Sequence, residues 1–478
     1  MTGDHPGQSA ADKTRGFALL VIMALAVFVS VLNNSMINVA IPHIRLELGV
    51  SAAAAGWLIT AYALVFAVGT ALYGRISDFV SLRKTFLMAL VVFAAGSLVC
   101  ALAPDFRLLL AGRTLQAAGA AAVPALAFGA VARLFPAGER GHAFGTIISS
   151  VGIGAAAGPI IGGLTVSLAG WPVLFLGTTG LLLALFVAAW FKLPDTDPAD
   201  RQKGQLRDFD LPGAILITIC AASALLGVTG IQRVGLDNAG SWGPMLLALL
   251  AGALFAWRIN HTRRPFAPPH LFANRRFMAA CGVAVFAQAA FLGGGLFLIP
   301  LLVIERHEMT ALTAGLVLAP GAFAIFLFSP FAGRLSDRIG PRKILLGCLL
   351  MVLAGLLLLS MLADRSPMVI AAGLLVMGMG YAGVMSPTAN AASTSLDRSI
   401  TGVGFGIYQL FFFMGAGMGA ALVGAFLAFR GESGAGALNP LYTGALGTAP
   451  YSDTFLMAAG MTVLALICTL GVRPAIKA

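Results

Sequence analysis

The feature that most constrains this chain of 478 residues is a succession of fourteen apolar segments, each long enough to cross a lipid bilayer. Backbone polar groups inside lipid must be satisfied within the protein, so continuous apolar segments of this length predict membrane-spanning α-helices. Only 10% of the residues are charged, against about 25% in soluble domains. The sequence therefore predicts an all-α integral membrane protein. The predicted spans are 16–42, 51–74, 84–104, 107–134, 142–168, 172–193, 210–232, 242–260, 276–303, 311–333, 343–363, 367–390, 402–429 and 453–473.

The basic residues predict the orientation. Although the net charge is +11, Lys and Arg lie in short loops between apolar segments, which favours a topological role over nucleic-acid binding. A cytoplasmic N-terminus places 23 of them inside and six outside, so both termini are expected in the cytoplasm. No cleavage site follows a short apolar core, which predicts a retained first helix. The five cysteines lie singly in apolar segments, and no metal or other cofactor is expected.

The chain contains an internal repeat. The segment from Gly74 to Asp78 (G-R-I-S-D) recurs from Gly333 to Asp337 (G-R-L-S-D), at an offset of 259 residues. We therefore predict two related six-helix halves, with the substrate bound at their interface near the bilayer midplane. The predicted parts are a tail 1–15, an N-terminal bundle 16–193, a cytoplasmic linker 194–209, an inserted helix pair 210–260, a C-terminal bundle 276–473 and a tail 474–478.

A stripe of glycines crosses the fifth span. Gly154, Gly158 and Gly162 recur every four residues, which places them on one helix face and allows a second helix to approach closely. Pro159 and Gly163 complete the pattern G-P-x-x-G-G, which resembles motif C of the major facilitator superfamily. That motif marks exporters (antiporters). A simple packing seam is the alternative interpretation.

The repeated loop predicts a gate. Its second copy, Gly333 to Lys343, resembles motif A of the same superfamily, whereas the first copy departs from the pattern at Phe79 and Ser81. A carboxylate there can accept hydrogen bonds from Arg or from the N-terminus of a neighbouring helix, forming a latch that breaks when the halves rock. Loops that merely satisfy the positive-inside rule are the alternative. The predicted gating residues are Gly74, Asp78, Arg83, Gly333, Asp337, Arg338 and Arg342.

Two further segments extend the resemblance to nearly the whole chain. Gly112 to Pro124 resembles motif B and places Arg113 inside the fourth span, where a functional role is the default interpretation and snorkelling the alternative. Leu32 to Pro42 resembles the L-D-x-T-x-x-N-V-A-L-P signature of fourteen-helix drug:proton antiporters. Within that family the sequence is most similar to the tetracycline efflux and multidrug exporter branch. The resemblance implies the major facilitator fold and drug export.

One departure concerns coupling. The signature Asp is Asn33 here, and none of the nineteen Asp and Glu lies within the middle of a predicted span. Asn33 lies roughly 14 Å and Arg113 roughly 9 Å from the outer face, so we expect them at similar depth. Each polar or aromatic residue alone is more often a helix–helix contact than a ligand contact. The predicted substrate-binding and coupling residues are Asn33, Asn34, Asn38, Tyr62, Arg113, Gln116, Gln288, Tyr408, Gln409 and Phe412.

Two functions follow as hypotheses. The first is a monomeric exporter of amphipathic drugs in a bacterial inner membrane, with protons as the coupling ion. The second is an exporter or facilitator of an anionic or neutral metabolite or lipid, with Arg113 as an anion site and no proton coupling. An enzyme is not expected, because no span carries a cluster of carboxylate, His or Cys residues suited to catalysis.

Overall fold

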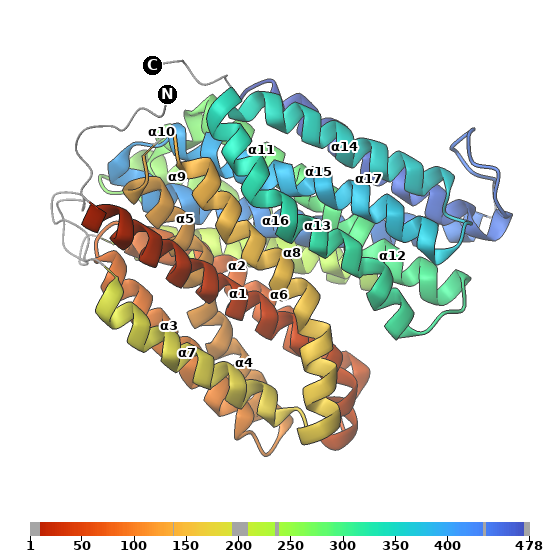
Figure 1. Ribbon diagram of the computed structural model, residues 1–478, viewed down its shortest axis with the longest axis horizontal. Coiled ribbons are helices and arrows are strands. Elements are labelled where there is room, and N and C mark those ends of the chain that lie inside the picture. Colours follow the sequence, from red (N-terminus) through yellow and green to blue (C-terminus); the bar gives the residue numbers. More distant parts are fainter. Residues whose placement is uncertain (1–9, 137, 194–208, 235–238, 434–435, 473–478) are drawn as a thin grey trace.

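The computed structural model describes residues 10–136, 138–193, 209–234, 239–433 and 436–472, and within them it is helical with no strand (Figure 1). In this part of the chain fourteen segments are long and apolar enough to cross a membrane, which confirms the predicted spans. The predicted linker and both predicted tails lie largely or wholly outside the described residues. The helices are α1 (Ala10–Glu47), α2 (Ala52–Ile76), α3 (Leu82–Ala101), α4 (Phe106–Ala120), α5 (Ala122–Leu134), α6 (Arg140–Ala169), α7 (Pro172–Lys192), α8 (Leu211–Val234), α9 (Ala239–His261), α10 (Pro269–Ala273), α11 (Arg275–Ala290), α12 (Leu298–Leu301), α13 (Ala311–Ile339), α14 (Pro341–Met361), α15 (Pro367–Thr394), α16 (Thr401–Ser433) and α17 (Ala449–Thr469).

The first span is longer than predicted. Pro42 was expected to end it, but α1 continues to Glu47. A proline removes one intrahelical hydrogen bond without preventing the helix from continuing. The chain turns instead at Gly49, whose φ of +63° is a conformation that glycine adopts at little cost.

Two predicted spans contain an interruption. The fourth divides into α4 and α5 at Ala121, because Pro124 has no N–H to donate to the carbonyl of Ala120. In the ninth span, α11 is followed by a π-helical segment, Phe291–Phe297, which contains three consecutive glycines. Such wide turns occur preferentially at functional sites.

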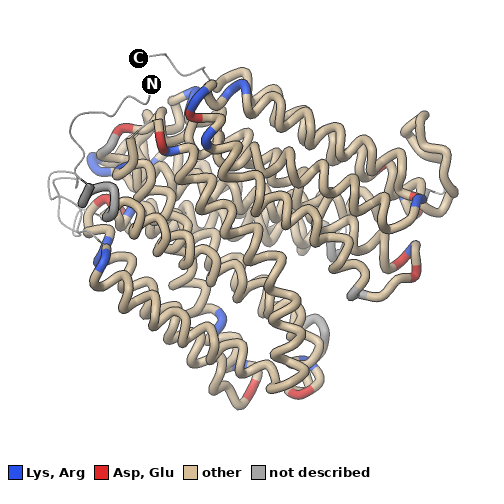
Figure 2. Tube along the Cα trace, in the orientation of Figure 1, with Lys and Arg blue, Asp and Glu red and all other residues tan. Residues whose placement is uncertain are grey.

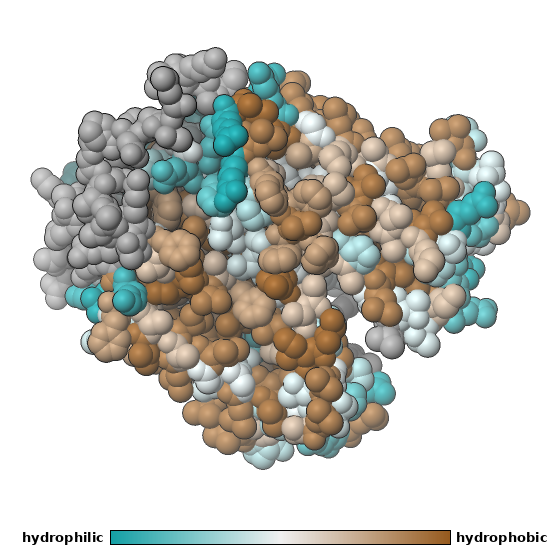
Figure 3. Space-filling model, viewed as in Figure 1, coloured by the Kyte–Doolittle hydropathy of each residue, from teal (hydrophilic) through white to brown (hydrophobic). Residues whose placement is uncertain are grey.

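The two halves, α1–α7 and α11–α17, have six spans each, because α4 and α5 share one span and α11 and α12 share another. They meet at one end of the molecule and diverge toward the other (Figure 1). We call the end where α1 begins and α17 ends the terminal face. Charged residues gather at the ends of the helices, and an apolar surface covers the middle (Figures 2 and 3). The chain therefore presents the apolar belt that a bilayer requires.

The interface between the halves repeats itself as the sequence does. Helix α6 of the first half packs against α13 of the second, and α16 of the second packs against α2 of the first. Phe144 of α6 and Phe405 of α16, which occupy equivalent positions in the repeat, meet with ring centroids 5.7 Å apart. The inserted helices α8 and α9 pack together, and α8 contacts both α2 and α16.

Candidate functional site

A buried arginine organises the N-terminal half. Arg113 of α4 is 1% exposed. Its Nη1 donates to Asn33 Oδ1 of α1 at 3.1 Å and to Gln116 Oε1, and its Nη2 lies 3.5 Å from Asn34 Oδ1. The guanidinium also lies 4.2 Å from the ring centroid of Tyr62 on α2. Asn33 and Arg113, which were expected at similar depth, are therefore in direct contact.

Two hydroxyl groups fix the amides around Arg113. The Nδ2 of Asn33 donates to Thr178 Oγ1 of α7 at 3.0 Å, and the Nε2 of Gln116 donates to Ser97 Oγ of α3 at 2.7 Å. Each amide therefore directs its carbonyl oxygen at the guanidinium. Thr178 and Ser97 were not predicted, because single hydroxyl residues in apolar helices carry no distinctive pattern.

The charge of Arg113 is met by neutral groups. Its hydrogen bonds go to the amide oxygens of Asn33, Asn34 and Gln116, and no ion pair joins it to a carboxylate in the described part of the chain. A guanidinium stays protonated in proteins, so this half holds a buried positive charge. Such a charge favours an anionic or electron-rich ligand group.

Aromatic rings connect this cluster to the interface between the halves. Tyr62 stacks on Phe66 with centroids 5.6 Å apart, and Phe66 and Phe413 of α16 meet edge to face with centroids 4.8 Å apart. Phe412, a predicted site residue, lies 5.1 Å from Phe413. We call Tyr62, Phe66, Phe413 and Phe412 the aromatic row. Phe66 and Phe413 were not predicted.

The remaining predicted binding residues lie apart from Arg113. Gln288 of α11 accepts a hydrogen bond from Tyr381 Oη of α15, and Tyr381 stacks on Phe291 at 3.9 Å. Tyr408 and Gln409 of α16 are buried, whereas Asn38 of α1 is exposed. The structure does not bring these residues into contact with the Arg113 cluster. It adds Tyr381, which the sequence analysis missed.

At the terminal face, Asp78 joins the first half to the second. Its Oδ1 accepts from the backbone N–H of Gly402 at 2.9 Å, and its Oδ2 accepts from that of Val403 at 3.0 Å, both in the first turn of α16. Arg133 donates to the same carboxylate at 2.5 Å, and Arg75 lies 3.6 Å away. Burial raises the pKa of the Asp78 carboxyl above its ordinary value, although both arginines and both N–H groups lower it.

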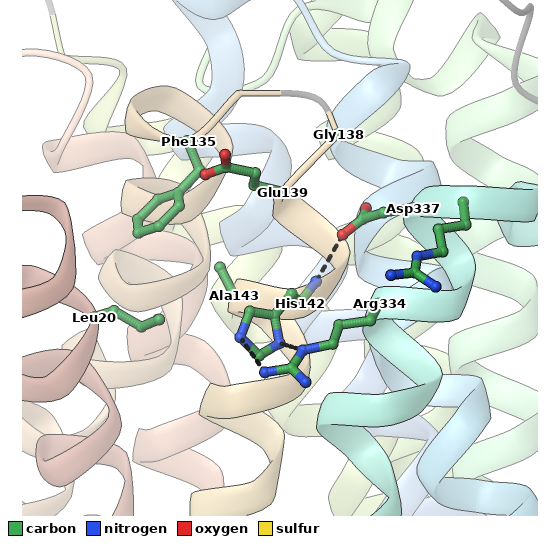
Figure 4. Close-up of a pocket in the computed structure, with 9 residues that line it drawn as sticks. Leu20, Phe135, Gly138, Glu139, His142, Ala143, Arg334 and Asp337 are labelled. Carbon is green, nitrogen blue, oxygen red and sulfur yellow. Dashed lines mark hydrogen bonds between the residues drawn. The ribbon is translucent and has the colours of Figure 1, made fainter. Parts of the chain in front are cut away.

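Asp337 forms the equivalent contact in the opposite direction. Its Oδ1 accepts from Gly141 N at 2.8 Å and its Oδ2 from His142 N at 2.9 Å, in the first turn of α6 (Figure 4). Asn390 Nδ2 donates to Oδ1 at 3.2 Å. The side chain of Arg334 donates to His142 Nδ1 at 3.2 Å beside a cavity of about 300 Å³. Each half thus holds the N-terminus of a helix from the other.

The repeat's glycines allow these contacts. A Cβ at Gly74 would lie 2.7 Å from Gly406 Cα on α16, and a Cβ at Gly333 would overlap the backbone of Gly141. Helices of opposite halves therefore touch at backbone level. We call the two carboxylates with their helix N-termini the paired latches.

Other predicted gating residues take no part in the paired latches. Arg83 donates to the carbonyl of Trp190 and lies 5.4 Å from its ring centroid, within the first half. Arg338 is exposed and lines the same cavity as Glu139, and Arg342 is half-buried. Arg133 and Asn390, which contact the two carboxylates directly, were not predicted.

The glycine stripe of α6 faces α1. A Cβ at Gly154 would lie 3.1 Å from Phe28 O, one at Gly162 would lie 2.9 Å from Met36 Cα, and one at Gly158 would overlap Ser35. Gly163 is looser, with Val39 Cγ1 3.9 Å from such a Cβ, and Pro159 lies on the exposed side. The stripe is a seam between two helices of the same half.

We expect Gly158→Ala to weaken this seam. The added methyl group must displace Ser35 or the backbone of α1, a type of overpacking that costs about 1–3 kcal/mol. The measurement is the melting temperature of the purified protein, together with its transport rate, and both should fall. Gly177→Ala is the control, because a Cβ at Gly177 meets nothing within 4 Å. Equal melting temperatures for the two variants would contradict a tight seam.

The chain is similar to known transporters. Residues 23–420, and again 322–477, match the family described as the Major Facilitator Superfamily. The chain is 27% identical over 416 residues to the riboflavin transporter RibZ of Clostridioides difficile, covering 86% of this chain and 88% of that protein. It is 28% identical to the multidrug resistance protein Stp of Mycobacterium tuberculosis, over 86% of this chain and 75% of that protein. It is also 28% identical to the tetracenomycin C resistance and export protein of Streptomyces glaucescens, over 90% of this chain and 80% of that protein.

Solved structures share the fold at low sequence identity. The human organic anion transporter MFSD10 (TETRAN) superposes with a TM-score of 0.66 at 16% identity, over 97% of this chain and all of that chain. The transporter FucP, in its outward conformation, gives a TM-score of 0.62 at 15% identity, over 95% of this chain and 99% of that chain. These likenesses extend over both halves.

Proposed function

The chain belongs to the major facilitator superfamily, and on that premise we propose that it exports small amphipathic molecules, drugs or antibiotics among them, by alternating access. In this mechanism the two halves rock about a central site and expose it to one face at a time. Relatives named for multidrug resistance and for tetracenomycin C export support the assignment.

The observation that carries the proposal is the pair of latches. Asp78 and Asp337 each bind the first turn of a helix in the opposite half, and both contacts lie at the terminal face. With 23 basic residues assigned to this face and six to the other, we place the terminal face in the cytoplasm of a bacterial cell. The structure then corresponds to the outward-facing state, in which an exporter releases its substrate.

The Arg113 cluster suggests the chemistry of the substrate. Its buried positive charge is surrounded by neutral amides. The cluster adjoins the aromatic row, which extends to the interface of the halves. A flat aromatic molecule can stack along such rings while a carbonyl or anionic group approaches the arginine. We therefore propose that neutral and anionic amphiphiles are handled at least as well as cations.

Proton antiport is the proposed driving reaction, although the signature carboxylate is replaced by Asn33. The alternative function is export or facilitated diffusion of an anionic or neutral metabolite or lipid without proton coupling. It is favoured by the carboxylate-free surroundings of Arg113 and by the relative named as a riboflavin transporter.

Transport in proteoliposomes tests the coupling. A proton gradient of one pH unit supplies about 1.4 kcal/mol for each exchanged proton, so one-for-one antiport should accumulate a neutral fluorescent amphiphile about tenfold. Dissipating the gradient with an ionophore should abolish the accumulation. Equilibration without accumulation would contradict antiport and support the alternative.

A further inference from the structure

A second cavity lies at the terminal face, beside the inserted helices. It has a volume of about 490 Å³, within the range of small-molecule sites. Three arginines line it: Arg75 at the end of α2, and Arg263 and Arg264 in the segment between α9 and α10. Asn260 and Thr262 add polar groups, and none of the described residues that line the cavity is a carboxylate.

Contacts with neighbouring groups hold the walls of this cavity in place. Arg75 is 4% exposed, donates to the carbonyl of Pro265 at 3.2 Å and lies 4.7 Å from the ring centroid of Phe79. It also lies 3.6 Å from the carboxylate of Asp78, which it shares with Arg133. The nearby carboxylate of Asp210 accepts from Arg258 at 2.7 Å and from Phe266 N at 3.0 Å. Asp210 therefore anchors the segment that carries Arg263 and Arg264 without entering the cavity.

The position of the cavity suggests the source of its ligand. Trp242 and Trp257 lie near the two ends of α9, are 49% and 61% exposed, and mark the two interfaces of a bilayer. The exposed leucines between them, Leu246, Leu247, Leu249, Leu250 and Leu254, face lipid. Arg263 and Arg264 follow Trp257 by six and seven residues, which places the cavity at the level of lipid headgroups.

We propose that this cavity binds a phosphate-bearing anion, supplied by an anionic phospholipid of the adjacent leaflet. Arginine guanidinium groups match the geometry of phosphate oxygens, and basic pockets at a cytoplasmic membrane surface attract anionic headgroups. The proposed orientation determines only which leaflet supplies the lipid. Binding is measured without transport, so failure here and failure of the proposed function are distinguishable.

The test compares lipid binding in two matched variants of the full-length protein. In nanodiscs of phosphatidylcholine with added phosphatidylglycerol, we expect Arg263→Gln/Arg264→Gln to weaken phosphatidylglycerol binding about tenfold or more. The control is Arg275→Gln/Arg276→Gln, which removes the same charge from an exposed pair that does not line the cavity. Arg75 is left unchanged because it also contacts Asp78.

A second arm distinguishes the sources of phosphate. In pure phosphatidylcholine nanodiscs, inorganic phosphate is compared with chloride at equal ionic strength, with melting temperature as the readout. Stabilisation by inorganic phosphate that Arg263→Gln/Arg264→Gln removes would identify a soluble phosphate compound as a ligand of the same site. Equal losses of phosphatidylglycerol binding in both variants, or no loss in either together with no phosphate effect, would overturn the proposal.

Discussion

Replacing Asp78 and Asp337 together by asparagine is expected to open the terminal face. Both oxygens of each carboxylate accept from N–H donors, so in either rotamer the asparagine amide would direct an NH₂ group at a donor. An unsatisfied buried group costs about 1–3 kcal/mol, so the double variant should populate the open form at least about tenfold more. Asp78→Asn should have the larger single effect, because it also deprives Arg133 of its ion-pair partner.

The measurement is cysteine labelling from the terminal face. Ser393 is 4% exposed near the end of α15, so Ser393→Cys in a chain without its five native cysteines should react slowly with an impermeant maleimide until the latches break. Asp397→Asn is the control, because Asp397 is exposed beyond α15 and forms no part of the paired latches. If the double variant folds poorly, the single variant Asp337→Asn tests the latch. The native Asp337 carboxylate has no ion pair within the described residues, so its loss leaves no arginine without its partner. Unchanged labelling in both variants would refute the latch.

The fold could be predicted from the sequence because its determinants are local. Each span is a continuous apolar segment, and the bilayer leaves such a segment few alternatives to a helix. The interruptions were less visible. The break at Ala121 has a local cause, because Pro124 lies three residues further on. The extension of α1 beyond Pro42 depends instead on the position of Gly49, the next residue whose backbone adopts a turn conformation easily.

The candidate site could be predicted in part, because motifs identify residues but not their partners. Asp78 and Asp337 stand out in the repeat, yet their hydrogen-bond partners in α16 and α6 lie 324 and 196 residues away. These partners are backbone N–H groups, which have no sequence signature. The same holds for Thr178 and for Phe413, whose roles arise only when helices of different origin pack together. Arg83 shows the opposite error, since a basic residue in a gating motif stacks on Trp190 inside one half.

Restoring a carboxylate beside Arg113 is expected to reverse the charge preference of the site. In Asn33→Asp, one oxygen would take the place of the amide oxygen 3.1 Å from Arg113 Nη1. The second carboxylate oxygen would replace Asn33 Nδ2, which now donates to Thr178 Oγ1. The Thr178 hydroxyl, which now donates to the carbonyl of Leu174, would then have to rotate and donate to that carboxylate oxygen. The arginine is then neutralised by an ion pair, and an anionic substrate loses the charge that attracts it.

The size of this change follows from the Coulomb energy. Two unit charges about 4–8 Å apart interact by roughly 2–4 kcal/mol at the effective dielectric constant of a partly buried site, so the ratio of cation to anion transport should rise about thirtyfold or more. The measurement is a transport profile across cationic, neutral and anionic amphiphiles at several pH values. Asn38→Asp is the matched control, since it adds the same charge to the same helix at an exposed position that does not contact Arg113. The contrary result is a native protein that exports only cations, together with an Asn33→Asp variant whose transport profile and pH dependence are unchanged. That result would show that the carboxylate-free surroundings of Arg113 do not set the charge selectivity of transport.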